Sequence, residues 1–230
     1  MRHFGLIGKS LGHSWSAEYF TQKFAAEGID ADYRLLELPE LTAEVVERLN
    51  DELHGYNVTI PYKETIIPFL RALAPVAAEI GAVNVVKDGV GYNTDWIGVK
   101  KSLVEILRSL DKPALILGRG GAAKAVRYAL ATMGIETITI SARGTITADI
   151  SAFGLIVNAT PLGMWPDIAT YPDIDYAALT PRHVLFDCVY NPEQTEFLRR
   201  GKAQGATVIG GKKMLEIQAE EAGKIFDFDS

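Results

Sequence analysis

One stretch restricts the fold of this chain more than any other: "ALILGRGGAAKAV", residues 114–126. Four apolar residues predict a buried strand, and the alanine-rich run after the glycines predicts a helix. Gly118, Gly120 and Ala123 stand in the G-x-G-x-x-G/A register between them. There the first glycine makes a tight turn, the second admits a pyrophosphate close to the backbone, and the small third residue lets the helix pack closely. The stretch predicts a dinucleotide site, with a purely structural strand-to-helix turn as the alternative.

Strands and helices alternate along the rest of the chain. Ser16 is the expected N-cap of the first helix and Gly28 its C-terminal stop, and Thr42 lies near the start of the second helix. We expect strands at 3–8, 31–38, 55–60, 136–140, 154–160, 183–190 and 206–211, and a hairpin at 82–95 around Asp88-Gly89. We expect helices at 16–28, 41–50, 96–110, 119–134, 195–205 and 213–226, with helical stretches broken by proline at 65–81. The pattern predicts an α/β protein of two lobes with parallel sheets in both.

Composition and charge exclude several functions. The formal net charge is −6, whereas a nucleic-acid-binding surface is basic. No apolar run reaches the ~18 residues that suggest a membrane span, and glycine and polar residues come too early for a secretory signal. Cys188 is the single cysteine, and the four histidines lack the spacing of metal ligands. We expect a cytoplasmic protein without a metal, a nucleic acid or a membrane partner.

The residues after the strand at 136–140 bear on the choice of cofactor. An NAD site usually has an acidic residue about 20 positions after the glycines, where it binds the ribose hydroxyls. This chain has Ser141, Ala142 and Arg143 there. A hydroxyl and a guanidinium suit a 2′-phosphate, so we expect NADP. An ordinary surface arginine, and with it NAD, is the alternative.

Three polar clusters lie at expected strand ends, which is where open α/β sheets build their sites. "GHSWSAEYF" provides two hydroxyls at a helix start, where they can hold a carboxylate. "NVTIPYK" and "GAVNVVKDGVGYNTD" add amides, hydroxyls, a lysine and an aspartate. Taken alone, the lysine would be a solvated surface residue. The clusters comprise Ser14 and Ser16; Asn57, Thr59 and Lys63; and Asn84, Asn93, Thr94 and Asp95.

These motifs, together with "GKSLGHSWS", "GRGGAAKA", "NATPLGM", "DCVYNPEQTEFL" and "GGKKMLEIQ", make the chain resemble the shikimate dehydrogenase family over most of its length. The resemblance implies reversible reduction of 3-dehydroshikimate to shikimate with NADPH. It implies a substrate domain of residues 1–98 and 211–230, to which the last helix returns, and a Rossmann-like NADP domain of residues 99–210. A cleft would separate the two.

The resemblance also implies roles for individual residues. Lys63 and Asp95 are the pair expected to transfer the proton. The substrate would be bound by Ser14 and Ser16 at its carboxylate, by Tyr190 near that end, and by Asn57, Thr59, Asn84 and Gln218 at its hydroxyls. The cofactor would contact Gly118, Arg119, Gly120, Gly121, Ala122, Ala123, Ser141, Arg143, Asn158, Thr160, Met164 and Gly211. His13 would support the segment that carries Ser14 and Ser16, which we call the serine loop.

The chain departs from the family pattern at several places. Ala17 replaces a usual proline, Arg119 replaces a usual alanine, and Arg143 is shifted by one position. About a dozen residues separate Arg143 from the next strand, too few for a helix and a strand between parallel neighbours. We therefore predict a trimmed nucleotide-binding lobe.

Two alternative functions stay open at this level. A quinate or aminoshikimate dehydrogenase would share the same carboxylate-binding and hydroxyl-binding residues. A non-catalytic sensor of a shikimate-type ligand could dispense with Lys63 and Asp95, and both are present. For the assembly, a monomer and a homodimer are both compatible with the sequence.

Overall fold

The computed structural model describes residues 1–12, 14–107 and 111–228. His13 and the last three residues of the helix expected at 96–110 lie outside the described residues, and within the described residues that helix already ends at Leu103. The chain divides into two compact units. Unit 1 is Met1–Thr94 with Ala219–Ser230, and unit 2 is Asp95–Gln218. The expected domain boundaries fall a few residues from these, after 98 and before 211.

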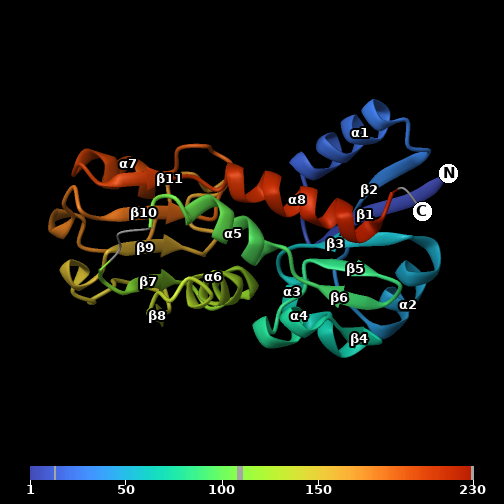
Figure 1. Ribbon diagram of the computed structural model, residues 1–230, viewed down its shortest axis with the longest axis horizontal. Helices are drawn as coiled ribbons and strands as arrows, with labels where there is room; N and C mark the ends of the chain where they lie inside the picture. The colour runs from blue at the N-terminus through green and yellow to red at the C-terminus, as the bar shows by residue number, and fades with distance from the viewer. Residues whose placement is uncertain (13, 108–110, 229–230) are drawn as a thin grey trace. The chain divides into compact units, whose positions relative to one another are not determined.

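Unit 1 contains a six-stranded sheet in the order β2-β1-β3-β5-β6-β4 (Figure 1). Strands β1, β2 and β3 are parallel, whereas β5 is antiparallel to both β3 and β6. The sheet is therefore mixed: β1, β2 and β3 are parallel as predicted, and the predicted Asp88-Gly89 hairpin, which can join only antiparallel strands, adds β5 and β6. The strands are β1 (Arg2–Gly8), β2 (Ala31–Glu37), β3 (Gly55–Val58), β4 (Ala72–Leu73), β5 (Val85–Lys87) and β6 (Val90–Tyr92).

The helices of unit 1 begin and end where local chemistry allows it. Gly28 ends α1 with a φ of 67°, a left-handed conformation that glycine adopts readily. Thr42 caps α2 by accepting a hydrogen bond from the Val45 N–H. Ser14, not Ser16, occupies the N-cap of α1, because the backbone is still extended at Ser14. The helices are α1 (Trp15–Glu27), α2 (Ala43–Glu52), α3 (Tyr62–Thr65), the 3-10 helix η1 (Ile67–Phe69) and α4 (Pro75–Ile80).

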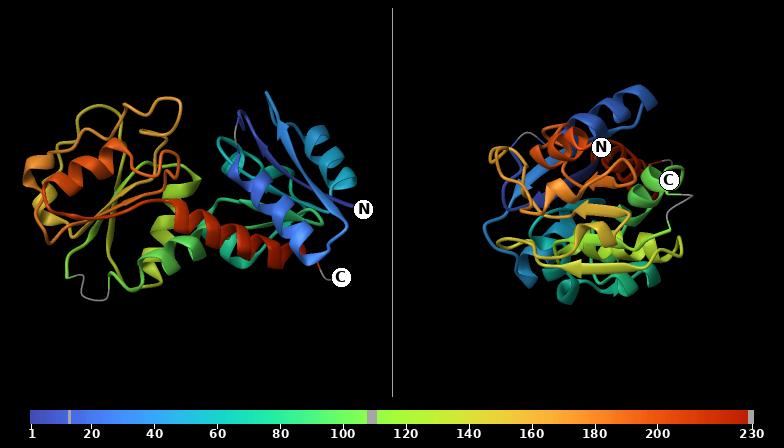
Figure 2. Two further views of the ribbon diagram at one scale, coloured as in Figure 1. Left: turned by 90° about the horizontal axis from the view of Figure 1, so that it is seen from above. Right: turned by 90° about the vertical axis from the view of Figure 1, so that its left-hand side faces the viewer.

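Alternating residues of the unit 1 strands pack into two cores. Phe4 and Leu6 face α1 and the end of α8 (Lys212–Phe226), where aromatic rings cluster. Ile7 and Val58 face the opposite side, against α2 and the segment that contains α3. Figure 2 shows the helices of each unit beside its strands. Helices and their flanking segments therefore cover both faces of the central strands.

Unit 2 contains a five-stranded parallel sheet in the order β11-β10-β9-β7-β8 (Figure 1). Between β8 and β9 the chain forms only the short 3-10 helix η2 (Ile150–Ala152), which confirms the predicted trimming. Strand β8 is therefore an edge, and Ile138 on it is 50% exposed. The strand order reverses between β7 and β9, the switch point where such sheets bind ligands. The strands are β7 (Ala114–Leu117), β8 (Thr137–Ile140), β9 (Leu155–Asn158), β10 (Val184–Asp187) and β11 (Thr207–Ile209).

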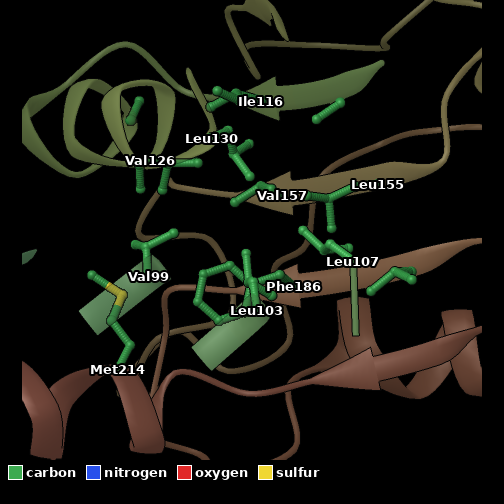
Figure 3. Packing of buried hydrophobic residues seen from close by; sticks show 14 residues of the cluster. Val99, Leu103, Leu107, Ile116, Val126, Leu130, Leu155, Val157, Phe186 and Met214 are labelled. Carbon is green, nitrogen blue, oxygen red and sulfur yellow. The ribbon is translucent and has the colours of Figure 1, made fainter. Parts of the chain in front are cut away.

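Helices cover both faces of the unit 2 sheet. One core joins α5 (Asp95–Leu103), α6 (Gly121–Ala131) and the first turns of α8 to the strands, as Figure 3 shows for Val99, Val126 and Met214. The other core contains Phe197 and Leu198 of α7 (Glu196–Ala203), together with residues near the 3-10 helix η3 (Tyr176–Ala178). This packing holds the carboxyl ends of β7, β9 and β10 in fixed positions.

Candidate functional site

The serine loop of unit 1 follows β1. Ser14 and Ser16 are half-buried at the first turn of α1. Glu37, at the end of the neighbouring β2, accepts hydrogen bonds from the Leu11 N–H at 2.6 Å and the Gly12 N–H at 3.3 Å. The carboxylate thus fixes the loop that leads to the two hydroxyls.

Asn57 lies at the centre of a buried polar network. Its side chain is 6% exposed, and its Oδ1 accepts a hydrogen bond of 2.7 Å from the Tyr33 hydroxyl. Burial raises the pKa of Tyr33 well above its ordinary value, so the phenol stays protonated and donates. Asn57 Nδ2 donates to the backbone carbonyl of Asn84 at 3.2 Å. These two hydrogen bonds fix the orientation of the Asn57 side-chain amide.

Asn84 is fixed by Thr94 through two hydrogen bonds. The Thr94 N–H donates to Asn84 Oδ1 at 2.7 Å, and Asn84 Nδ2 donates to Thr94 Oγ1 at 2.9 Å. Both residues are almost completely buried. Asp95 follows Thr94 directly and is the first residue of α5, where it is 3% exposed.

Lys63 and Thr59 lie just after β3 in the same unit. Lys63 is half-buried in α3, and its carbonyl accepts a 2.7 Å hydrogen bond from the N–H of Val83, the residue before Asn84. Thr59 is half-buried, and its N–H donates to the Ile7 carbonyl at 3.0 Å. Unit 1 therefore brings the backbone of Lys63 next to that of Asn84, although about 20 residues separate them in sequence.

The glycine turn of unit 2 has the geometry that its sequence predicts. Gly118 has a φ of 120°, and a Cβ there would lie 2.8 Å from the Ala159 carbonyl oxygen. Gly120 is the N-cap of α6, and Gly121, Ala122 and Ala123 form its first turn. The N–H groups at this helix start, close to the backbone after β9, can bind phosphate oxygens.

The residues after β8 lie at the edge that the trimming exposes. Ser141 and Arg143 are exposed, as is Arg119 in the glycine turn. Since no strand of the described residues lies beyond β8, these side chains have room to approach a bound phosphate. The structure thus offers two arginines on the side of the sheet where the adenosine half of a dinucleotide would lie.

A second polar network joins the ends of β9 and β10. Asn158 is completely buried, and its side-chain amide makes hydrogen bonds within its own loop and to Asp187. Thr160 and Met164 are half-buried farther along that loop. Gly211 is buried where a Cβ would lie 2.6 Å from the Cys188 carbonyl oxygen. Asn158 therefore holds the loop through its amide, and its contact with the cofactor stays a prediction.

Two predicted substrate residues belong to unit 2. Tyr190 is half-buried, and burial raises the pKa of its phenol. Gln218 is 9% exposed in α8, where its Nε2 donates to the Leu215 carbonyl at 3.0 Å. Both remain predictions as substrate contacts.

Two residues with clear structural roles were not among the predicted site residues. Tyr33 orients Asn57 from β2, which β1 separates from β3, and Asp187 binds Asn158 from the neighbouring strand. Asp187 had a sequence signal, because a carboxylate ends an apolar strand much as Asn158 does. Tyr33 had none, since its partner is set by the register between strands.

Comparison with known proteins agrees with this arrangement. Residues 6–86 match the family model described as the shikimate dehydrogenase substrate binding domain. The shikimate dehydrogenase (NADP(+)) of Caldicellulosiruptor saccharolyticus is 39% identical, over 98% of this chain and 92% of that protein. The chain belongs to the shikimate dehydrogenase family.

Solved structures of the family share the fold. The shikimate dehydrogenase of Thermus thermophilus, in complex with NADP(H) and shikimate, has a TM-score of 0.88 and 30% identity. That match covers 99% of this chain and 94% of the other. Quinate dehydrogenase from Corynebacterium glutamicum, in complex with NAD, has a TM-score of 0.82 and 28% identity, covering 98% and 93% of the two chains.

The described residues contain neither a membrane-spanning helix nor a cluster of metal ligands. None of their helices combines the length and the apolar character that crossing a membrane requires. Within the same residues, no group of three or more His, Cys, Asp or Glu side chains could hold a metal ion.

Proposed function

We propose that this protein catalyses the reversible, NADPH-dependent reduction of 3-dehydroshikimate to shikimate. The observation that carries the proposal is the 39% identity to a shikimate dehydrogenase over 98% of the chain, with Lys63 and Asp95 both present. Most of the proposed substrate residues belong to unit 1, with Tyr190 and Gln218 in unit 2, and the proposed cofactor residues belong to unit 2. A cytoplasmic location and a monomeric or homodimeric assembly remain predictions.

The polar groups of unit 1 suit a polyhydroxylated acid. The Ser14 and Ser16 hydroxyls can donate to a carboxylate at the start of α1, where the helix dipole also favours negative charge. Asn57 and Asn84 offer amides held by neighbouring groups, so little side-chain entropy is lost when a hydroxyl binds them. Thr59, Tyr190 and Gln218 are the further proposed substrate contacts.

Lys63 and Asp95 are the proposed pair for proton transfer. A hydride from NADPH, if the cofactor is bound, would reach the ketone carbon, and negative charge would develop on the ketone oxygen. The Lys63 ammonium can stabilise that charge and give the oxygen its proton. Asp95, a buried carboxylate at the N-terminus of α5, would hold the ammonium in position. In the oxidation direction the lysine would take up the same proton.

The residues of unit 2 fit a dinucleotide. At Gly118 the φ of 120° and the Ala159 carbonyl oxygen, which would lie 2.8 Å from a Cβ, leave no room for a side chain. A pyrophosphate can therefore approach the backbone here and reach the N-terminus of α6. Arg143 and Ser141 are the groups proposed to bind the 2′-phosphate that distinguishes NADP from NAD. Arg119 adds a second positive charge near the phosphates.

A quinate dehydrogenase is the second candidate. The specific observation in its favour is the TM-score of 0.82 with the quinate dehydrogenase that was solved with NAD. Quinate carries the same carboxylate and similar hydroxyls, so the unit 1 residues would serve both substrates. The exposed edge after β8 would hold a 2′-phosphate less firmly than a complete lobe, which keeps NAD as an alternative cofactor.

An absorbance assay at about 340 nm, where reduced nicotinamide absorbs, tests the proposal. Shikimate and quinate are each combined with NADP and with NAD, and the ratio kcat/KM is measured for all four pairs. We expect the shikimate–NADP pair to give the highest value. A higher value for quinate with NAD would assign the second function, and the absence of turnover with every pair would refute both. The Lys63→Ala variant is the negative control.

A further inference from the structure

We infer that Asp187 is a positioning residue for the cofactor: its carboxylate fixes the Asn158 amide, and that amide holds the loop of residues 159–163 against the glycine turn. The inference rests on the proposed function, because it assigns the loop to cofactor binding. Asp187 is 0% exposed, so it acts through Asn158 and touches no ligand itself.

Asp187 receives three hydrogen bonds from three parts of unit 2. Its Oδ1 accepts from Asn158 Nδ2 at 3.0 Å and from the Val189 N–H at 2.9 Å. Its Oδ2 accepts from Thr195 Oγ1 at 2.6 Å. Asp187 and Asn158 are register partners at the ends of β10 and β9. A fully buried carboxylate at this position connects the two strand ends with the N-terminus of α7.

The carboxylate determines which way the Asn158 amide points. Asn158 Nδ2 donates to Asp187 and to the Leu162 carbonyl at 3.0 Å, while its Oδ1 accepts from the N–H and the hydroxyl of Thr160. A flipped amide would bring oxygen against the Asp187 and Leu162 oxygens and nitrogen against the Thr160 N–H. Both Asp187 oxygens face donors, Asn158 Nδ2 and the Val189 N–H at Oδ1 and the Thr195 hydroxyl at Oδ2, so Oδ1 acts as an acceptor and excludes the flip.

The loop that the amide holds is in contact with the glycine turn. The Leu162 N–H donates to Thr160 Oγ1 at 3.1 Å, so the loop closes on itself. The Ala159 carbonyl oxygen would lie 2.8 Å from a Cβ on Gly118, so loop and turn are packed backbone against backbone. Both segments follow β9 and β7 at the switch point of the sheet, so a shift of the loop would shift one wall of the cofactor site.

A double-mutant cycle tests this chain of contacts. The variants are Asp187→Ala, Asn158→Ala and the combination of both, with NADPH affinity measured by the fluorescence of the bound nicotinamide. We expect each single variant to weaken NADPH binding by about tenfold. The NADPH affinity of the double variant should lie within about twofold of that of Asn158→Ala, because both substitutions break the same chain of contacts. We expect shikimate affinity, measured by calorimetry, to change less than NADPH affinity.

Two further variants separate positioning from general loss of stability. Asp187→Asn can still accept from Asn158 and Val189 through its amide oxygen, so we expect it to restore NADPH affinity to within about threefold of wild type. Thr195→Val removes the Oδ2 bond and the cap that Leu198 N–H uses, on the side away from Asn158. We expect it to lower the melting temperature while NADPH affinity stays nearly unchanged.

The outcomes distinguish the inference from the proposed function. If wild type turns over shikimate but the single effects simply add, or if Thr195→Val weakens NADPH as much as Asp187→Ala, the inference is wrong and the function stands. If wild type neither binds NADPH nor oxidises shikimate, the proposed function fails and the inference fails with it. Should Asp187→Ala not fold by circular dichroism, the same cycle with Asp187→Leu, which fills the volume but accepts no hydrogen bond from Asn158, decides by the same criterion of coupling.

Discussion

The Tyr33 hydroxyl in β2 donates a 2.7 Å hydrogen bond to Oδ1 of Asn57 in β3, across β1, which lies between these two strands. Because that oxygen is already engaged, the orientation of the Asn57 amide is set before any substrate arrives. A second buried tyrosine, Tyr56, makes the equivalent bond to Asn50 Oδ1 at 3.1 Å, away from the proposed substrate residues. The two pairs therefore provide a test and its control.

We expect Tyr33→Phe to raise the KM for shikimate several-fold and to leave the KM for NADP nearly unchanged. The reason is that Asn57 would lose the partner that orients it, and a buried acceptor left unpaired costs about 1–3 kcal/mol. Tyr56→Phe should lower stability without changing either KM. Steady-state kinetics on both variants check this, and an equal KM for shikimate in Tyr33→Phe and wild type would contradict it.

Lys63→Ala should lower kcat by about 100-fold or more, the scale of losing a general acid–base group. NADPH binding should stay nearly intact, because the proposed cofactor residues all belong to unit 2. Lys87→Ala, which removes a half-buried lysine at the end of β5, is the matched control and should keep wild-type turnover. Equal kcat in Lys63→Ala and wild type would remove Lys63 from the mechanism.

Arg143→Ala should weaken NADP binding much more than NAD binding, because only NADP carries the 2′-phosphate that the guanidinium would bind. The exposed Arg182, which precedes β10 at the amino end of the sheet, serves as the control substitution. Dissociation constants for both cofactors measure the effect. A parallel loss for NADP and NAD would show that Arg143 does not read the 2′-phosphate.

Gly118→Ala should abolish cofactor binding and lower the free energy of unfolding. At this position the φ of 120° disfavours any side chain, and the new Cβ would lie 2.8 Å from the Ala159 carbonyl oxygen. Gly134→Ala is the matched control, since it has a φ of 74° but no atom within 4 Å of its Cβ position. Gly134→Ala should therefore lose about 1 kcal/mol of stability and keep its cofactor affinity. Normal NADPH binding by Gly118→Ala would argue against the turn as the phosphate site.

Stability should depend on pH through Asp187. Burial raises the pKa of this carboxyl from 3.8 to about 7, against three hydrogen bonds that lower it. The pKa of Asp187 is higher in the folded protein than in the unfolded one. The contribution of its protonated carboxyl to stability is therefore complete below pH ~4 and is lost as pH rises through about 7. The full change is about 4 kcal/mol, at 1.36 kcal/mol for each of about three pKa units.

Chemical denaturation at pH 5 and pH 8 measures this change, with Asp187→Asn as the control. Between pH 5 and pH 8 the unfolding free energy of wild type should fall relative to that of Asp187→Asn, because the asparagine cannot ionise. The Arg199 guanidinium beside Glu196 lowers the pKa of that carboxyl to about 2, so Glu196 titrates below this window. An identical pH dependence in both proteins would show that Asp187 is not the titrating group.

Local sequence patterns were enough to predict much of this protein. The glycine turn at 118–123, the Asp88-Gly89 hairpin and the stop of α1 at Gly28 depend on the conformations of neighbouring residues, and the structure confirms them. The trimmed lobe also followed from sequence, because about a dozen residues cannot supply a helix and another parallel strand. The family, too, could be read from motifs along the chain.

Other features were decided only by the tertiary structure. Strand register determines that Tyr33 meets Asn57 and that Asp187 meets Asn158, and register is set by how the sheets bury their faces. The N-cap of α1 fell on Ser14 because backbone conformation, not residue preference, decided between two serines. Sequence thus named the groups that can do chemistry, whereas folding selected the buried partners that orient them, since hydrogen bonds between distant residues exist only once the strands are paired.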